Sequence, residues 1–257
     1  MSKVIINTLR RSGSTILWRT LRRGTNAICF DEPFNPEIIK LPTNNKKETL
    51  DEFIDLLNKS GDMFWKRYSP IHPIYEIKES NKSHVDWLEW LLKQRKDVVI
   101  DTTRCWNKQN LISEISASNV FMIHLYRAPA SFASSHILPS ELKSSFLGRL
   151  ELLKRRIRFF NLDKGYDYWN MEKIIGKGPK SIFDIKVLNS NISSETFYSW
   201  RAHTKLMYFW KIANDKIKRM GRSMFGERFL SVSYEKFCTR TNEVIEEIEN
   251  NTRYLFE

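Results

Sequence analysis

The chain has 257 residues and a formal net charge of +12 at pH 7, and 41% of its residues are hydrophobic. A chain of this size can bury one substantial core, so we expect a single globular domain over residues 1–257. No apolar run approaches the ~20 residues that span a bilayer, and a β-type run begins at residue 3, where a signal peptide would otherwise stand. These features argue against a membrane-spanning or secreted protein, and we expect a cytoplasmic location.

The excess of basic residues indicates an anionic partner. Nucleic acid is one such partner, but the sequence contains no zinc-finger spacing, RNP-like motif or obvious helix-turn-helix. An enzyme that binds a polyanionic substrate also needs arginines, and a basic surface can attract an acidic acceptor. The charge alone therefore leaves both classes of protein open.

The first motif lies in residues 3–18, KVIINTLRRSGSTILW. Their apolar residues predict a strand over 3–8 and a helix over 14–23. The turn between the two, RRSGST, carries two arginines, hydroxyl side chains and one glycine. A turn that brings backbone N–H groups and a helix N-terminus to one point can bind phosphate or sulfate; alternatively, the hydroxyls serve only to cap the helix. The ATP-binding pattern GxxxxGK[ST] does not fit, because Ser14 stands where it requires lysine.

The elements that follow alternate between strands and helices. A strand is expected at 27–30, followed by the acidic loop FDEPFNP at 30–36. Helices are expected at 48–58 and 87–93, and a buried strand at 97–101. Alternation of this kind predicts a parallel sheet with helices on both faces.

The second motif follows a further apolar run, VFMIHLY at 120–126, which reads as a buried parallel strand. Arg127 stands at the carboxyl end of this strand, where open α/β sheets bind their ligands. Pro129 is suited to start a helix, and Ser135 lies about two turns along the chain from Arg127. An arginine at this edge of a sheet is a candidate ligand-binding residue, and the alternative is a surface arginine in a helix-capping turn.

A largely helical segment is expected over 141–222, broken by GKGPKS at 176–181, before a strand at 229–233 and a terminal helix at 241–250. The region 137–200 is rich in aromatic residues and is a candidate acceptor-binding insertion. The expected fold is a single-domain α/β, P-loop-like parallel sheet flanked by helices, with a largely helical insertion after the second motif.

Together the two motifs resemble those of the sulfotransferases that use 3′-phosphoadenosine 5′-phosphosulfate (PAPS). RRSGST at 10–15 resembles the loop that binds the 5′-phosphosulfate, in the form found in the carbohydrate-type branch. RAPASFASS at 127–135 resembles the 3′-phosphate motif, an Arg-x-Pro with a serine eight positions after the arginine. The loop at 30–36 resembles the acidic-proline segment beside the transferring sulfate.

The resemblance implies a PAPS-dependent sulfotransferase that moves a sulfuryl group to a hydroxyl or amine of an acceptor, with a carbohydrate or glycolipid as the favoured class. It implies binding of 3′-phosphoadenosine 5′-phosphate through Arg10, Arg11, Ser12, Gly13, Ser14, Thr15, Arg127 and Ser135. Arg11 is expected to stabilise the leaving phosphate, and Glu32 to act as the base. Three residues are alternatives for the base: Asp31, Asp101 and His136. No metal is implied, and the cysteines and histidines show no metal-ligand spacing.

The chain departs from the family pattern in two places. Ala128 replaces a residue that is usually acidic, and nothing after Glu235 resembles the glycine- and lysine- or arginine-rich loop that covers the 3′-phosphate in many members. Tyr234 and Glu235 match the end of the family's late strand, and we expect them to be structural. Two other functions stay open: a P-loop-fold kinase of a small molecule or nucleotide, against which the missing lysine argues, and a basic nucleic-acid-binding protein.

Overall fold

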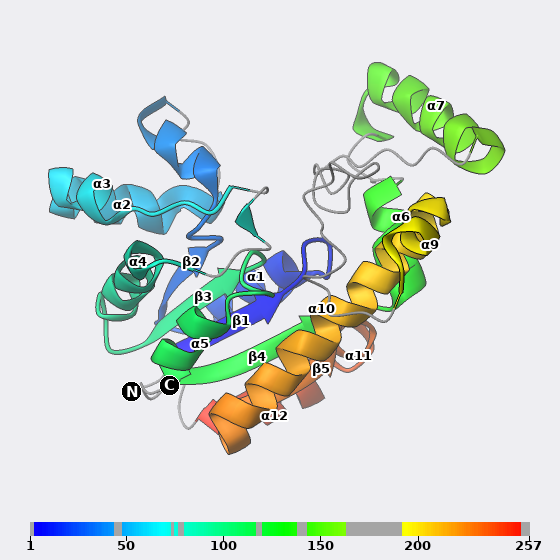
Figure 1. Ribbon diagram of the computed structural model, residues 1–257. Helices are drawn as coiled ribbons and strands as arrows, with labels where there is room; N and C mark the ends of the chain where they lie inside the picture. Colours follow the sequence, from blue (N-terminus) through cyan, green and yellow to red (C-terminus); the bar gives the residue numbers. More distant parts are fainter. Residues whose placement is uncertain are drawn as a thin grey trace.

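Five parallel strands form one sheet in the order β2-β3-β1-β4-β5 (Figure 1). They are β1 (Lys3–Thr8), β2 (Ile28–Asp31), β3 (Val98–Thr102), β4 (Val120–Tyr126) and β5 (Phe229–Ser233). The computed structural model describes residues 3–43, 48–72, 75–76, 80–116, 120–137, 143–162 and 192–252. Helices flank the sheet, so the expected α/β fold with a parallel sheet is confirmed.

The helices between and after the strands are mostly short. They are α1 (Ser14–Gly24), α2 (Asp51–Ser60), α3 (Asp62–Arg67), α4 (Lys82–Leu92), α5 (Gln109–Ser116), α6 (Pro129–Ile137), α7 (Phe146–Leu162), α9 (Ser194–Ser199), α10 (Ala202–Phe225), α11 (Tyr234–Thr239) and α12 (Thr241–Thr252). The described segments η1 (Pro36–Thr43), η2 (Glu48–Leu50) and η5 (Gly226–Arg228) are 3-10 helices.

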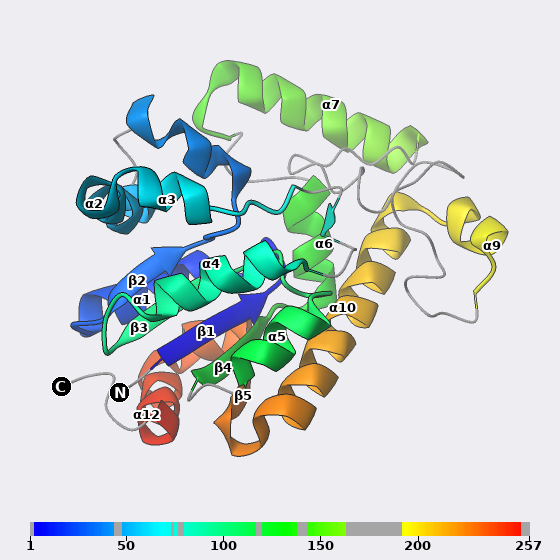
Figure 2. The same cartoon turned by 60° about the vertical axis from the view of Figure 1, so that its left-hand side comes forward.

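Alternate residues of the central strands face two separate layers of helices. On β1, Ile5 packs in a core with residues of α4, α5, α6 and α10. Its neighbours Val4 and Ile6 point the other way and pack with α1 and α12. All three are fully buried, and Figures 1 and 2 show the helices on both faces. A sheet covered on both faces needs continuous apolar runs, as the strand sequences have.

The strand predictions agree closely with the structure. The strands expected at 3–8, 120–126 and 229–233 have those bounds, and the other two are shifted by one residue. The sequence interpretation places no helix between β3 and β4, and this is wrong because α5 lies there. Its apolar pattern is only two turns long, too short to identify from periodicity. A crossover helix is nevertheless what two parallel strands of one sheet require.

Most of the insertion expected at 137–200 lies outside the described residues. This holds for 163–191, which includes the GKGPKS stretch at 176–181. The parts of the insertion that are described include α7 and α9, so they are helical as expected. Across the described chain, no helix has the length and apolar character needed to span a bilayer.

Candidate active site

The loop between β1 and α1 makes a tight turn at the carboxyl end of the central strand. Gly13 has a φ of 92° and Arg11 a φ of 66°, so both adopt left-handed backbone. The Ser12 N–H donates to the Leu9 carbonyl oxygen at 3.2 Å and closes the turn. A Cβ on Gly13 would lie 2.2 Å from Cδ2 of Tyr234. This position therefore requires glycine both for its backbone conformation and because of the ring that covers it.

Arg127, from the second motif, lies against this turn. Its Nη1 donates to the Arg11 carbonyl oxygen at 3.4 Å. Its Cζ lies 5.1 Å from the centroid of the Tyr234 ring, a distance typical of a cation–π contact. The sheet order explains the contact, because β4 pairs with β1 in parallel and both strands end at the same edge. Tyr234 therefore contacts both predicted phosphate motifs.

Residues of the second motif after Arg127 contact their neighbours in different ways. Glu235 Oε1 accepts a hydrogen bond from the Ala128 N–H at 3.0 Å, in agreement with a structural role. Ser135 is half-buried on α6, and its hydroxyl donates to the Phe132 carbonyl oxygen at 2.8 Å. His136 is fully buried with its ring 4.5 Å from that of Phe132. A base must reach the acceptor hydroxyl, so this burial argues against His136 in that role.

Several buried polar atoms around the two motifs have no hydrogen-bond partner among the described residues. They include Arg10 Nη1, Ser12 Oγ and Arg127 Nε. A buried polar group left unsatisfied costs about 1–3 kcal/mol, and bound anions would supply acceptors to donors of this kind. Ser14 and Thr15 stand in the first turn of α1, at its positive end, and add hydroxyl groups there.

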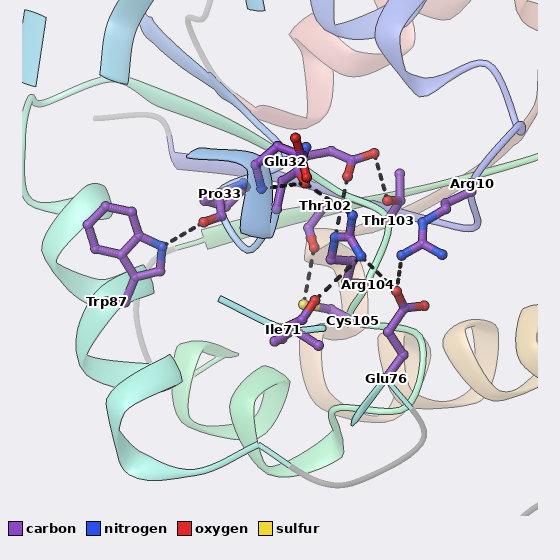
Figure 3. A network of polar contacts seen from close by, with 12 residues as sticks. Arg10, Glu32, Pro33, Ile71, Glu76, Trp87, Thr102, Thr103, Arg104 and Cys105 are labelled. Atoms are coloured by element: carbon purple, nitrogen blue, oxygen red, sulfur yellow. Dashed lines mark hydrogen bonds and ion pairs between the residues drawn. The ribbon is translucent and has the colours of Figure 1, made fainter. Parts of the chain in front are cut away.

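Glu32 directly follows β2 and has a φ of 47°. Among the described residues, Glu32 and Arg11 are the non-glycine positions with positive φ. Such a backbone costs about 1–3 kcal/mol and is found most often at functional sites. The loop after β3 holds its carboxylate: Thr103 Oγ1 donates to Oε1 at 2.8 Å, and Arg104 Nε lies 3.5 Å from Oε2 (Figure 3). The Glu32 side chain is 25% exposed, so an acceptor can approach it.

A buried ion network joins Glu32 to the loop between β1 and α1 (Figure 3). Arg104 Nη1 lies 2.9 Å from Glu76 Oε1, and Glu76 also pairs with Arg10. Burial raises the pKa of Glu76, and the positive charges of Arg10 and Arg104 partly offset this by lowering it. Because Arg10 belongs to the loop and Arg104 contacts Glu32, the network fixes the two regions relative to each other.

Sequence reasoning missed Glu76, Thr103 and Arg104. A signal exists for two of them, because Thr103 and Arg104 directly follow β3, whose carboxyl end lies beside that of β1. Glu76 carries no such signal, since it lies in the connection before α4. Only the folded chain brings its carboxylate to the two arginines.

Two further carboxyl groups lie at the same edge of the sheet. Asp31 and Asp101 are paired residues on the adjacent strands β2 and β3, and Asp101 is fully buried. Burial raises the pKa of Asp31 to about 7, and the neighbouring Glu32 carboxylate adds to the effect. Burial and the Asp31 carboxyl raise the pKa of Asp101 well above its usual range, while the Ser14 hydroxyl acts in the opposite direction. Burial therefore favours the protonated form of Asp101, beside the first turn of α1.

Comparisons with known proteins give no family model and no curated protein that matches the chain. Three similar solved structures all cover 100% of this chain. They are the sulfotransferase domain from the curacin biosynthetic pathway (14% identity, 75% of that chain covered, TM-score 0.49), the sulfotransferase domain from the Synechococcus PCC 7002 olefin synthase (17%, 74%, 0.49) and a sulfotransferase from Alicyclobacillus acidocaldarius (10%, 84%, 0.46). Similarities at this level do not assign the chain to a family.

Proposed function

We propose that this protein is a sulfotransferase that moves the sulfuryl group of PAPS to a hydroxyl or amine of an acceptor. The observation that carries the proposal is the contact between the two predicted phosphate motifs, in which Arg127 Nη1 lies 3.4 Å from the Arg11 carbonyl oxygen. A nucleotide with phosphate groups on both its 3′ and 5′ positions needs two anion sites close together, and these motifs offer two.

The residues around the turn fit a doubly charged nucleotide. Arg10 Nη1, Ser12 Oγ and Arg127 Nε are buried and lack acceptors among the described residues. We assign the 5′ end of the nucleotide to the turn at 10–15, whose backbone N–H groups lead into α1. We assign the 3′-phosphate to Arg127 and Ser135. Ser135 would redirect its hydroxyl from the Phe132 carbonyl oxygen to that phosphate.

We assign the base to Glu32. PAPS supplies an activated sulfuryl group, and the chain must orient the acceptor, take its proton and stabilise the leaving phosphate. Glu32 is partly exposed, and Thr103 and Arg104 fix its carboxylate. Burial raises the pKa of Asp31 to about 7, but its Oδ1 is buried, which gives an acceptor less access, so Asp31 stays the alternative. Arg11, held in strained backbone within the turn, is assigned to the leaving phosphate.

The acceptor class that we favour is a carbohydrate or glycolipid, on the resemblance of the motifs to the carbohydrate-type branch. The experiment is transfer of labelled sulfate from PAPS to a panel of polysaccharide and lipid extracts, with Glu32→Gln as the inactive control. Labelled product that depends on Glu32 would support the proposal. The absence of transfer to every acceptor, together with no binding of 3′-phosphoadenosine 5′-phosphate, would contradict it.

A further inference from the structure

Helix α7 carries an apolar surface that the rest of the described chain leaves exposed. Its large apolar side chains with exposures between 48% and 76% are Phe146, Leu147, Leu150, Leu153 and Ile157. These are five of the ten exposed large apolar side chains in the described part of the chain, although α7 has only 17 residues. A concentration of this kind marks a surface that meets a partner.

Four of these side chains form a single line along the helix, which we call the α7 stripe: Phe146, Leu150, Leu153 and Ile157. Their spacing of i, i+4, i+7 and i+11 places them on one helical face. Leu152 lies on a different face and is only 7% exposed. The side of the helix that carries Leu152 is therefore covered, and the α7 stripe faces outward.

Basic residues stand on both sides of the α7 stripe. Arg149 and Arg156, seven positions apart, share one flank, and Lys154 lies on the other. All three are exposed, and no ion pair joins them to another described residue. The sequence of α7, FLGRLELLKRRIRFFNL, holds five basic residues against the single acid Glu151. The charge on the helix is therefore strongly positive.

The position of α7 brings this surface to the functional side of the molecule. In Figures 1 and 2, α7 lies near α6 and beyond the carboxyl ends of the strands. The candidate active site is at the same edge of the sheet. A partner held by α7 would thus lie on the side where the acceptor must enter.

We propose that α7 docks this protein onto an anionic lipid surface. An apolar line with basic residues along both flanks matches a helix that lies in the membrane interface, with its apolar side chains among the acyl chains and its cations among the headgroups. The charge of α7 is complementary to anionic lipid. The proposal is independent of the transferase activity, and it describes binding to a surface rather than a span of the bilayer.

The test is co-sedimentation of the full chain with vesicles of phosphatidylcholine alone and of phosphatidylcholine mixed with phosphatidylserine. We expect binding to the anionic vesicles, weak binding to the neutral ones, and weaker binding at high salt because salt screens the headgroup charge. Absence of binding to anionic vesicles at low salt would overturn the proposal.

Substitutions separate the contributions of the stripe and its flanks. Leu150→Gln with Ile157→Gln should lower the partition coefficient at least tenfold, because two apolar side chains no longer enter the acyl region. Arg149→Gln, Lys154→Gln and Arg156→Gln together should lower it on the order of 100-fold, at about fivefold for each lost charge. Circular dichroism and thermal unfolding confirm that each variant folds.

Matched controls change the same chemistry at distant exposed positions. They are Ile39→Gln with Met63→Gln for the apolar pair, and Lys59→Gln, Lys66→Gln and Lys82→Gln for the charges. Equal losses in the control and α7 variants would overturn the proposal, because binding would then depend on overall charge.

A dimer that Leu153→Gln dissociates, without vesicle binding, would also overturn it, since the α7 stripe would then join two copies. A large loss of thermal stability in the Leu150→Gln, Ile157→Gln variant without vesicle binding would have the same consequence, because the chain itself would cover the stripe.

Discussion

Arg11 and Glu32 hold backbone conformations that side chains ordinarily avoid, and both stand at the carboxyl edge of the sheet. Arg11 is fixed by the turn before α1 and by Arg127, which donates to its carbonyl oxygen. Glu32 is fixed by its N–H, which donates to the Asp101 carbonyl oxygen at 2.9 Å, and by Thr103. Strain retained at two positions with assigned chemical roles is what a preorganised site requires.

Glu32→Gln tests the assignment of the base. The substitution keeps the shape of the side chain and its contact with Thr103 but removes the proton acceptor, so we expect turnover to fall about 10²-fold or more. Affinity for 3′-phosphoadenosine 5′-phosphate should stay unchanged. Single-turnover sulfate transfer and calorimetry measure the two quantities. Glu37→Gln, at an exposed position on η1, is the control; activity of Glu32→Gln within a few-fold of the parent would remove Glu32 from this role.

Asp31 and Asp101 predict a pH dependence of stability. Their pKa values are raised in the folded state, so the folded chain binds more protons than the unfolded one above pH ~4. The free energy of unfolding should therefore contain a contribution that falls as the pH rises from about 4 through about 7, the pKa of Asp31. The pKa of buried His124 is lowered to about 4 from its usual 6.5. Its contribution to the free energy of unfolding therefore rises with pH between these two values.

Asp101→Asn isolates this contribution from that of His124. Urea unfolding between pH 5 and 8 should show that the difference in stability, wild type minus variant, decreases as the pH rises. The variant lacks the carboxyl group that must otherwise hold a proton, so its stability increases relative to that of the wild type at high pH. A difference that is constant with pH, or that increases, would show that the carboxyl pair does not hold its proton into the neutral range.

At the level of elements, the turn before α1 and the start of α11 fit together at one point. Gly13 and Tyr234 are 221 positions apart in the chain, and the ring leaves no room for a Cβ on the glycine. Arg127 lies against the same ring. The aromatic side chain is therefore the structural link between the elements that carry the two motifs.

Gly13→Ala should destabilise the fold by more than the strain of its backbone. Tyr234→Ala supplies the control, because it removes the ring that a Cβ on Gly13 would meet. We expect Gly13→Ala to cost about 1–2 kcal/mol for its left-handed backbone and about 1–3 kcal/mol more through overpacking against the ring. Urea unfolding of the two single variants and the double variant measures both contributions. A cost of Gly13→Ala that is the same with and without the Tyr234 ring would contradict the contact.

At the scale of the whole molecule, the sheet and the positions of the loops that carry the two motifs could be predicted from the sequence. The runs at 3–8 and 120–126 are apolar, and polar turns follow them, so their ends are well defined. The placement of Arg11, Glu32 and Arg127 at one edge of the sheet could be predicted, because each stands at or just beyond the end of a strand. Local sequence was sufficient where one element alone determines the position of a residue.

Contacts between distant segments could not be predicted in this way. Glu76 reaches Arg10 and Arg104 from a short connection, and nothing in its neighbours indicates a buried carboxylate. The Asp31–Asp101 pair depends on which strands are neighbours, which is a property of the sheet order and not of either strand. Helix α5 was missed because two turns of apolar residues are too few to show a period.

The central claim is that the turn at 10–15 and Arg127 bind opposite ends of one nucleotide. Calorimetry with two ligands tests it: 3′-phosphoadenosine 5′-phosphate and adenosine 5′-phosphate, which lacks the 3′-phosphate. Arg127→Ala should weaken binding of the first ligand by ~1.5–3 kcal/mol, about ten- to hundredfold, and leave that of the second unchanged. Arg95→Ala, at an exposed position, should affect neither. Equal losses for both ligands, or no loss for either, would contradict the claim.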